Sequence, residues 1–277
     1  MRIPFLKRSR ATKPVIPAEE ADPIDDKPMP LLDHLIELRT RLMWSFGAFM
    51  IAFLVCYYFS GAIYGFLAAP LAHVEERMGG SQRMIYTGLT EGFFTYLKVS
   101  MFGALFIAFP IMANQLWLFV APGLYRSEKR AFLPFLIASP VLFAMGAALV
   151  YFVMLPFVLW FSLNQQIISA DVEVQMLPKV SDYLDLVTKL VLAFGLCFQL
   201  PVVVTLAGLA GLIEAKTLAS GRRYALLGIV VVSAVVTPPD MISPFLLAGP
   251  IYALYEASIW CVRLIELRRK REDAAAA

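Results

Sequence analysis

The sequence predicts an all-α polytopic membrane protein with six transmembrane helices, and three observations lead to this fold class. Of its 277 residues, 60% are hydrophobic and 16% are charged, whereas soluble domains average about 45–50% and about 25%. The hydrophobic residues gather in blocks of about 20, which is the length of helix needed to cross about 30 Å of hydrocarbon. Polar and apolar residues do not alternate within these blocks, so the pattern favours helices over the strands of a membrane barrel.

Six blocks are predicted to cross the membrane. They are Met43–Ile63, Val99–Phe119, Ala131–Phe161, Leu190–Leu212, Tyr224–Thr237 and Met241–Val262. The fifth is short, because its 14 residues rise only about 21 Å as a helix. The sixth carries Pro244 and Pro250 near its start, so its regular part is also expected to be short. Short helices and helices bent by proline predict a cupped shape.

The distribution of Lys and Arg predicts the orientation. Nineteen of these residues lie in the segment up to Leu42, in the connections after the second and fourth spans, and after the sixth span. The connections on the other side carry three, Arg77, Arg83 and Lys179. Because basic residues are retained in the cytoplasm, both termini are predicted to be cytoplasmic.

Three regions are expected along the chain. Residues 1–29 are rich in Pro and charged residues and poor in apolar ones, which predicts a disordered cytoplasmic tail. Residues 30–265 form the membrane domain, with long outer connections at 64–98 and 162–189 that are apolar enough to fold as interfacial caps. Residues 266–277 form a C-terminal cytoplasmic tail whose basic run would attract anionic membrane lipid.

The sequence gives little support to an enzyme. Both histidines, His34 and His73, lie outside the spans, and no glycine-rich phosphate loop or pair of carboxylates within a span is present. The three cysteines fall inside spans at spacings that predict neither a disulfide framework nor a zinc site. We therefore expect no catalysis, no metal and no cofactor.

Acidic residues beside the first span raise a more specific question. On a helix, Asp33, Glu37 and Arg41 share one face, while Leu31, Leu35, Leu38 and Leu42 share another. One interpretation is an ordinary pair between Glu37 and Arg41, worth a few tenths of a kcal/mol. The other is a carboxylate held at the membrane surface to receive a cationic ligand.

Glu128 poses the same choice. It follows Ser127 at the expected start of the third span, where an acid would also stabilise the helix N-terminus. Glu37 and Glu128 are both predicted to lie on the cytoplasmic side, at a membrane boundary and among basic residues.

Polar residues within a span are costly and suggest a role. Gln199 lies near Pro201 in the fourth span, where it could satisfy a carbonyl freed by that proline or contact a partner. Glu256 lies seven residues before Arg263, about 10 Å along a helix, so it is expected to face protein or water.

Five ordered motifs resemble the TatC family, the polytopic receptor subunit of the twin-arginine protein translocase. They are His34-Leu-Ile-Glu-Leu-Arg39, Ala69-Pro-Leu71, Gln115-Leu-Trp-Leu-Phe-Val-Ala-Pro-Gly-Leu-Tyr125 with Glu128, Phe194-Gly195 with Pro201, and Thr237-Pro-Pro-Asp240. The resemblance covers residues 30–265. It implies export of folded proteins across a bacterial-type cytoplasmic (inner) membrane, driven by the proton-motive force.

The resemblance also implies partners and site residues. The expected partners are twin-arginine signal peptides, TatA- and TatB-like single-span subunits, further copies of the chain and membrane lipid, with no nucleic acid. Glu37 and Glu128 would hold the two arginines of the signal peptide. The residues expected to complete the signal-peptide patch are Arg39, Phe119, Leu124 and Tyr125. Those expected at partner-docking or structural positions are Gln199, Pro70, Tyr151, Asp240 and Glu256, with the fifth span as a docking element.

The chain departs from the family pattern at two positions. Many members have Glu where this chain has Gln199, so a titrating carboxylate cannot be assumed there. The residue four positions after Asp240 is often Gln in the family but is Pro244 here.

Two other functions are alternatives to the translocase. A secondary transporter of a small solute usually shows internal repeats and a midplane site, whereas the connections of the first three spans do not match those of the last three. A purely structural scaffold would tolerate loss of Glu37 and Glu128 without losing export.

Overall fold

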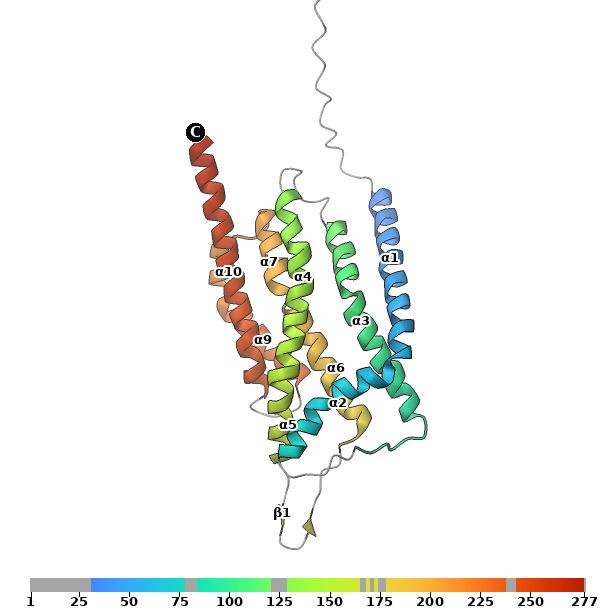
Figure 1. Cartoon of the computed structure of the whole chain (residues 1–277). Coiled ribbons are helices and arrows are strands. Elements are labelled where there is room, and N and C mark those ends of the chain that lie inside the picture. Colours follow the sequence, from blue (N-terminus) through green and yellow to red (C-terminus); the bar gives the residue numbers. More distant parts are fainter. Residues whose placement is uncertain are drawn as a thin grey trace, which may run out of the picture.

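A computed structural model describes residues 31–77, 84–120, 129–164, 168–169, 172–173, 178–237 and 243–276. Nearly all of these residues are helical, which confirms the all-α fold class (Figure 1). The two strands in this part of the chain, β1 (Ile168–Ser169) and β2 (Val172–Glu173), form a small antiparallel ladder. Helix α1 begins and α10 ends at the same end of the bundle, which we call the terminal end; the other is the opposite end (Figure 1).

Five helical segments in the described ranges are long and apolar enough to cross a membrane, judged by length and composition. They are His34–Tyr58, Glu91–Phe119, Pro134–Asn164, Val180–Leu209 and Ser243–Arg271. The chain is therefore a multi-pass membrane protein. The predicted fifth span corresponds to α9 (Arg222–Val236), which has only 15 residues.

The first predicted span ends earlier than expected. Helix α1 (Leu31–Tyr58) stops before a bend at Phe59, and α2 (Ser60–Arg77) then leads away at a steep angle to α1 (Figure 1). Hydrogen bonds from Phe59 N to Val55 O (3.2 Å) and from Ile63 N to Phe59 O (3.1 Å) carry the chain through the bend. The predicted span Met43–Ile63 was therefore wrong at its C-terminal end, because the apolar run continues into α2.

The central helices follow the prediction more closely. Helix α3 (Glu91–Val120) packs along α1, and α4 (Lys129–Leu149) continues through a short π-helix, η3 (Val150–Met154), into α5 (Leu155–Asn164). Prolines lie inside α3 and α4, at Pro110, Pro134 and Pro140.

The fourth predicted span, Leu190–Leu212, is not one helix. It consists of the end of α6 (Val180–Cys197) and α7 (Leu200–Leu209), which are separated at Phe198 and Gln199. Pro201 lies in the first turn of α7, where its missing N–H costs least. Helix α6 also begins ten residues earlier than predicted, because residues 180–189 combine four buried apolar side chains with polar ones.

The last helices also differ from the prediction. Helix α8 (Ala215–Ser220) leads into α9, which is short as predicted, but α10 (Ser243–Ala276) has 34 residues. The sixth span was predicted to be short because of Pro244 and Pro250. Instead Pro244 occupies the first turn of α10, and the Leu, Glu, Arg and Lys residues after Val262 favour helix, so the helix continues through the predicted tail.

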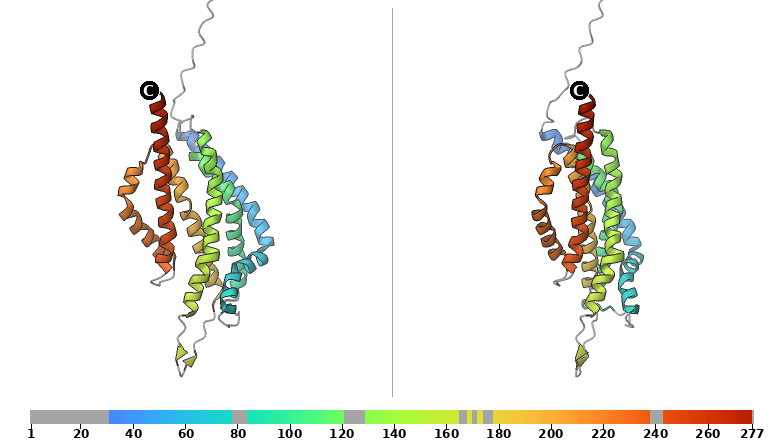
Figure 2. Two further views of the ribbon diagram at one scale, coloured as in Figure 1. Left: turned by 60° about the vertical axis from the view of Figure 1, so that its left-hand side comes forward. Right: turned by 90° about the vertical axis from the view of Figure 1, so that its left-hand side faces the viewer.

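Close packing joins α4 to α6 in the middle of the bundle. The largest group of buried side chains involves α2, α3, α4, η3, α5, α6, α9 and α10. Figures 1 and 2 show these helices packed in one bundle. A Cβ atom added at Gly195 would lie 2.4 Å from the ring of Phe143, so α6 approaches α4 as closely as it does because position 195 has no side chain.

Polar side chains tie the opposite end together. The Tyr183 hydroxyl donates to the Leu67 carbonyl (2.6 Å), and the Tyr151 hydroxyl donates to the Phe66 carbonyl (2.7 Å). The Glu91 carboxylate accepts from the backbone N–H groups of Thr87 (2.8 Å), Gly88 (3.1 Å) and Ser181 (3.2 Å). The bonds made by Tyr183 and Ser181 join the described parts of the two long connections; that these connections cap the membrane interface stays a prediction.

Candidate functional site

Glu37 lies on α1 near the terminal end and is paired. Its Oε1 accepts from Nε (3.0 Å) and Nη2 (2.7 Å) of Arg41, one turn further along the helix. The side chains of Glu37 and Arg41 are 23% and 26% exposed, so solvent still reaches both. The ordinary i, i+4 pair considered from the sequence is therefore present.

Helix α3 supplies the neighbours of this pair. Nη1 of Arg41 donates to Oε1 of Gln115 (3.2 Å). One turn beyond Gln115, the ring of Phe119 stacks on that of His34, with centroids 4.3 Å apart and planes 18° apart. The geometry therefore brings Glu37, Arg41, Gln115, His34 and Phe119 together where α1 and α3 meet at the terminal end.

A cavity of about 490 Å³ adjoins this cluster. Its lining is mostly apolar and comes from α1, α3, α4, α6 and α7; its polar members include Arg41, Ser45, Gln115, Ser139 and Gln199. Phe119 and Leu38 also line it. The cavity matches the cupped shape predicted from the sequence, and it links the charged cluster to the polar side chain at the break between α6 and α7.

Gln199 is almost fully buried in that break, 9% exposed. Its Nε2 donates to the Ser139 carbonyl (3.0 Å), and its Oε1 accepts from the Ser139 hydroxyl (2.5 Å). The Trp117 indole donates to the same hydroxyl (3.3 Å). Gln199 therefore satisfies a carbonyl of α4, rather than one freed by Pro201, and joins α3, α4 and the α6–α7 break.

The remaining described candidates lie elsewhere. Arg39 is exposed on a different face of α1 from Glu37 and lines another groove. Pro70 is buried in α2, and Tyr151 bonds and stacks on Phe66 at the opposite end.

Glu256 faces protein, as predicted. Its carboxylate accepts from Nε (2.6 Å) and Nη2 (2.9 Å) of Arg222 and from the Tyr252 hydroxyl (3.0 Å). It therefore ties α10 to the start of α9.

Four candidates lie outside the described residues. They are Glu128, Leu124, Tyr125 and Asp240. Their roles remain predictions.

Sequence reasoning did not connect Ser139 and Trp117 with Gln199. A serine preceding Pro140 within an apolar run was a signal that a polar group lies at this depth, but the partner lies 60 residues away in sequence. Pairing across helices cannot be read from spacing along one chain.

Comparison with known proteins identifies the family. Residues 33–250 match the family model described as Sec-independent protein translocase protein (TatC). The TatC protein of Magnetococcus marinus is 47% identical over 246 residues, which cover 89% of this chain and 88% of the relative. The TatC protein of Escherichia coli is 37% identical over 245 residues, 88% of this chain and 92% of the relative.

A solved structure gives the same result. The crystal structure of a TatC described as a twin arginine translocase receptor superposes with a TM-score of 0.72 at 37% identity, covering 83% of this chain and 98% of that one. The family model alone spans more than half of the chain. The chain therefore belongs to the TatC family of Sec-independent protein translocase proteins.

Proposed function

We propose that this chain is the receptor that binds twin-arginine signal peptides within a translocase for folded proteins. The observation that carries the proposal is the position of Glu37: a partly exposed carboxylate at the terminal end of α1, paired with Arg41, which lines an apolar cavity. The related crystal structure is described as that of a twin arginine translocase receptor. The comparisons support this function and give no support to the alternative, a transporter of a small solute.

The ion pair between Glu37 and Arg41 can be exchanged for a pair between Glu37 and an arginine of the ligand. Both bonds from Arg41 go to one carboxylate oxygen, Oε1, and Arg41 keeps a second acceptor in Gln115. An arginine of the signal peptide can therefore bond to Oε2, or replace Arg41 while Arg41 stays bound to Gln115. Arginine suits this role better than lysine, because its planar fork matches a carboxylate with two parallel hydrogen bonds.

The free energy of these ion pairs limits the selectivity that they can provide alone. Exposed ion pairs contribute about 0–1 kcal/mol each, so two would give at most a ~30-fold preference for arginine. The apolar cavity supplies the rest of the affinity by burying the hydrophobic segment of the signal peptide. The carboxylate lies at the membrane boundary because the ligand arrives with its own apolar segment.

Glu128 is proposed as the second carboxylate, with Leu124 and Tyr125 beside it. All three follow Val120, the last residue of α3, and α3 carries Gln115 and Phe119 at this same end of the bundle. Their proximity in sequence to that cluster supports the proposal, which otherwise rests on the family motif.

The terminal end is proposed to face the cytoplasm, with six spans in the inner membrane and the proton-motive force driving transport. The excess of basic residues in the segments assigned to this end supports the orientation. Because α9 is short, the bilayer beside it would be thinned.

The chain works with other subunits of the Tat translocase, and we propose α9 as a docking helix for TatA- or TatB-like spans. Leu227, Val231 and Val235 recur every four residues on α9 and are 64%, 55% and 81% exposed. This apolar row is open to a partner helix. Gln199 is less suited to direct docking, because its amide is already bonded to Ser139.

Site-specific photo-crosslinking tests the receptor function. A photo-crosslinking residue at Leu38, which lines the cavity, is expected to capture a twin-arginine signal peptide and to lose the product when Arg-Arg becomes Lys-Lys. The same crosslinker at Phe93, exposed near the opposite end, is the matched control and should capture neither peptide. Equal capture of both peptides at Leu38 would contradict the proposal.

A further inference from the structure

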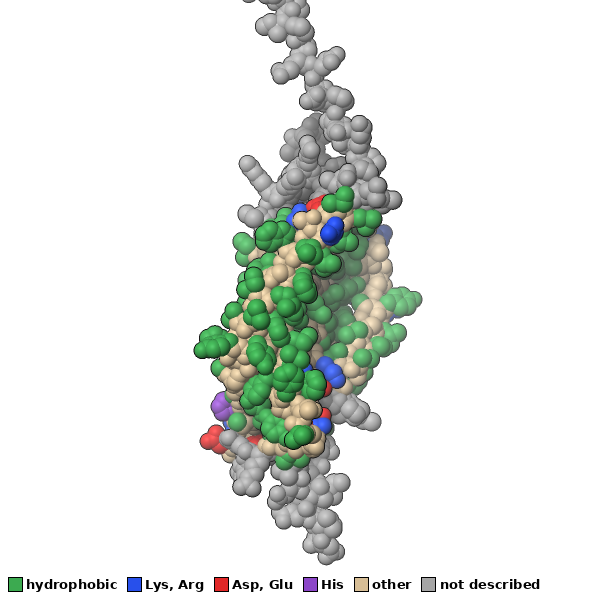
Figure 3. Space-filling model, turned by 90° about the vertical axis from the view of Figure 1, so that its right-hand side faces the viewer, with side chains coloured by type: hydrophobic (Ala, Val, Ile, Leu, Met, Phe, Trp, Pro, Cys, Tyr) green, Lys and Arg blue, Asp and Glu red, His purple; other side chains and the backbone are tan. Residues whose placement is uncertain are grey.

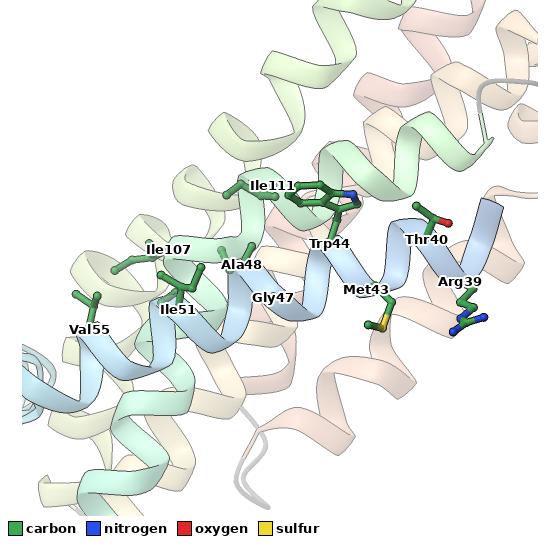
Figure 4. A pocket seen from close by; sticks show the side chains of 12 residues that line it. Arg39, Thr40, Met43, Trp44, Gly47, Ala48, Ile51, Val55, Ile107 and Ile111 are labelled. Carbon is green, nitrogen blue, oxygen red and sulfur yellow. The ribbon is translucent and has the colours of Figure 1, made fainter. Parts of the chain in front are cut away.

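A second groove lies on the outer side of α1, where α1 meets α3. It has a volume of about 880 Å³. Its lining residues are Arg39, Thr40, Met43, Trp44, Gly47, Ala48, Ile51, Ala52, Val55, Ile107, Ala108 and Ile111. Figure 3 shows that hydrophobic side chains dominate the face that carries α1, and Figure 4 shows the α1 and α3 side chains around the groove.

Charge is confined to one end of this groove. Arg39 is the charged residue in the lining, and Thr40 is its neighbour at the same end (Figure 4). The Arg39 side chain is exposed and has no hydrogen bond or ion pair with any residue in the described part of the chain. Among the described residues, the groove is thus apolar with one cation at one end that none of them pairs, a charge distribution that complements an anionic amphiphile.

The walls of the groove fit a flexible chain better than a helix. Close helix–helix contacts in membranes use small residues, and here Ala52, Ala104 and Ala108 are already buried in the contact between α1 and α3. The open wall instead carries large side chains: Met43 is 64% exposed, Trp44 69%, Ile51 69% and Ile107 59%. These side chains would hold a helix away from the groove but can lie along an acyl chain.

The length of the groove also suits a lipid. The 12 residue steps from Arg39 to Ile51 rise about 18 Å, compared with about 15 Å for the hydrocarbon of one leaflet. Trp44 lies five residues further along α1 than Arg39, about 7.5 Å deeper, the interfacial depth at which tryptophan is enriched.

We propose that this groove binds an anionic phospholipid of the cytoplasmic leaflet, with its phosphate on Arg39 and an acyl chain along Met43, Trp44, Gly47 and Ile51. The proposal goes beyond the receptor function and shares with it only the orientation of the terminal end. Anionic lipids are abundant in the cytoplasmic leaflet and attract basic residues at its surface. The bound lipid would cover a face of α1 that the rest of the described chain leaves open.

Quenching of Trp44 fluorescence provides the test. The full chain is reconstituted into phosphatidylcholine vesicles that contain increasing fractions of a lipid brominated on its acyl chain, either phosphatidylglycerol or phosphatidylcholine. Subtracting the emission of a Trp44→Phe variant isolates the signal of Trp44 from those of the other tryptophans. Half-maximal quenching is expected at a ~5-fold lower fraction of the anionic lipid, equivalent to the ~1 kcal/mol of one basic residue near a membrane surface.

Two variants test separately how the lipid headgroup and the apolar groove contribute to binding. Arg39→Gln should remove the preference for the anionic lipid and leave general quenching intact. Gly47→Leu should lower quenching by the anionic lipid, because no atom lies within 4 Å of a Cβ added at Gly47, so the new side chain fills the groove without a clash. Gly65→Leu on α2 is the matched control, since its Cβ also meets nothing within 4 Å, and it should quench as the unmodified chain does.

Three results would overturn the proposal. Equal quenching by the two brominated lipids would show that Arg39 selects no headgroup, and so would a preference that survives Arg39→Gln. A photo-crosslinker at Ile51 that captures a polypeptide instead of lipid in native membranes would assign the groove to a partner helix.

Discussion

Two clusters of polar side chains, one at each end of the molecule, differ in what they bind. At the opposite end, Tyr183, Tyr151 and Glu91 bond to backbone groups of other segments. At the terminal end of α1, Glu37 and Arg41 bond to each other, and Arg41 also bonds to the side chain of Gln115.

This difference separates a scaffold from a site. A backbone carbonyl or amide within a packed segment cannot turn away, so a bond to it fixes the distance between two elements. A bond between two partly exposed side chains can be exchanged for one with a ligand, at low cost. The opposite end is thus built to hold α2, α3 and α6 in place, and the terminal end of α1 to change partners.

The largest expected effect on stability is at the opposite end. Tyr183→Phe removes a buried hydrogen bond to Leu67, and Tyr183 is only 4% exposed. We expect a loss of about 1–3 kcal/mol in the free energy of unfolding, measured by unfolding the reconstituted protein. Tyr151→Phe removes a similar but exposed bond and should cost less. Equal losses, or weaker peptide binding per folded molecule in either variant, would contradict the division between scaffold and site.

Substitutions in the middle of the bundle should lower stability by an intermediate amount. Gln199→Met keeps the side-chain volume but removes both bonds to Ser139. Hydrogen bonds between helices in membranes contribute about 0.6 kcal/mol on average, so we expect a loss of about 1 kcal/mol. Ser139→Ala should give a similar loss, and combining the two changes should add little if they act through one network.

Replacing Glu75 by Gln should give a smaller change in stability, of opposite sign. It is buried in α2, 7% exposed, and burial raises the pKa of its carboxyl group. The folded state therefore holds the proton more tightly than the unfolded state, and stability falls as pH rises from the ordinary carboxyl range through the raised pKa. Above that range Glu75→Gln should be more stable than the unmodified chain, and at acidic pH the two should match. Glu76→Gln is the control, because Glu76 is exposed.

The smallest change in stability is expected at the site. Glu37→Gln breaks a partly exposed i, i+4 pair, worth about 0.2–0.5 kcal/mol, while Arg41 keeps its bond to Gln115. Unfolding of the reconstituted variant should therefore stay close to that of the unmodified chain. A loss as large as that of Tyr183→Phe would make Glu37 part of the scaffold.

Local sequence signals predicted much of the fold. Blocks of apolar residues located the helices, and the length of α9 followed from its run of 14 apolar and small residues. The prediction failed where a change from apolar to polar residues does not mark the end of a helix. The apolar run after Tyr58 turns into α2, and the basic residues after Val262 continue α10.

The site was predicted in part, for a similar reason. Glu37 and Arg41 lie one turn apart, so their pairing followed from helical spacing. Gln115, 74 residues from Arg41, and Ser139, 60 residues from Gln199, come together only through packing. The family resemblance placed Arg39 in one patch with Glu37, but residues two apart on a helix lie on different faces, and Arg39 lines a different groove.

The most direct test of the account is the affinity of the full chain, in lipid nanodiscs, for Arg-Arg and Lys-Lys forms of one signal peptide, compared with that of Glu37→Gln. The unmodified chain is expected to prefer Arg-Arg by up to ~30-fold, and Glu37→Gln should lower this ratio to at most about fivefold, the upper limit for one remaining exposed pair. The same preference in both proteins would contradict the claim that Glu37 receives an arginine of the signal peptide.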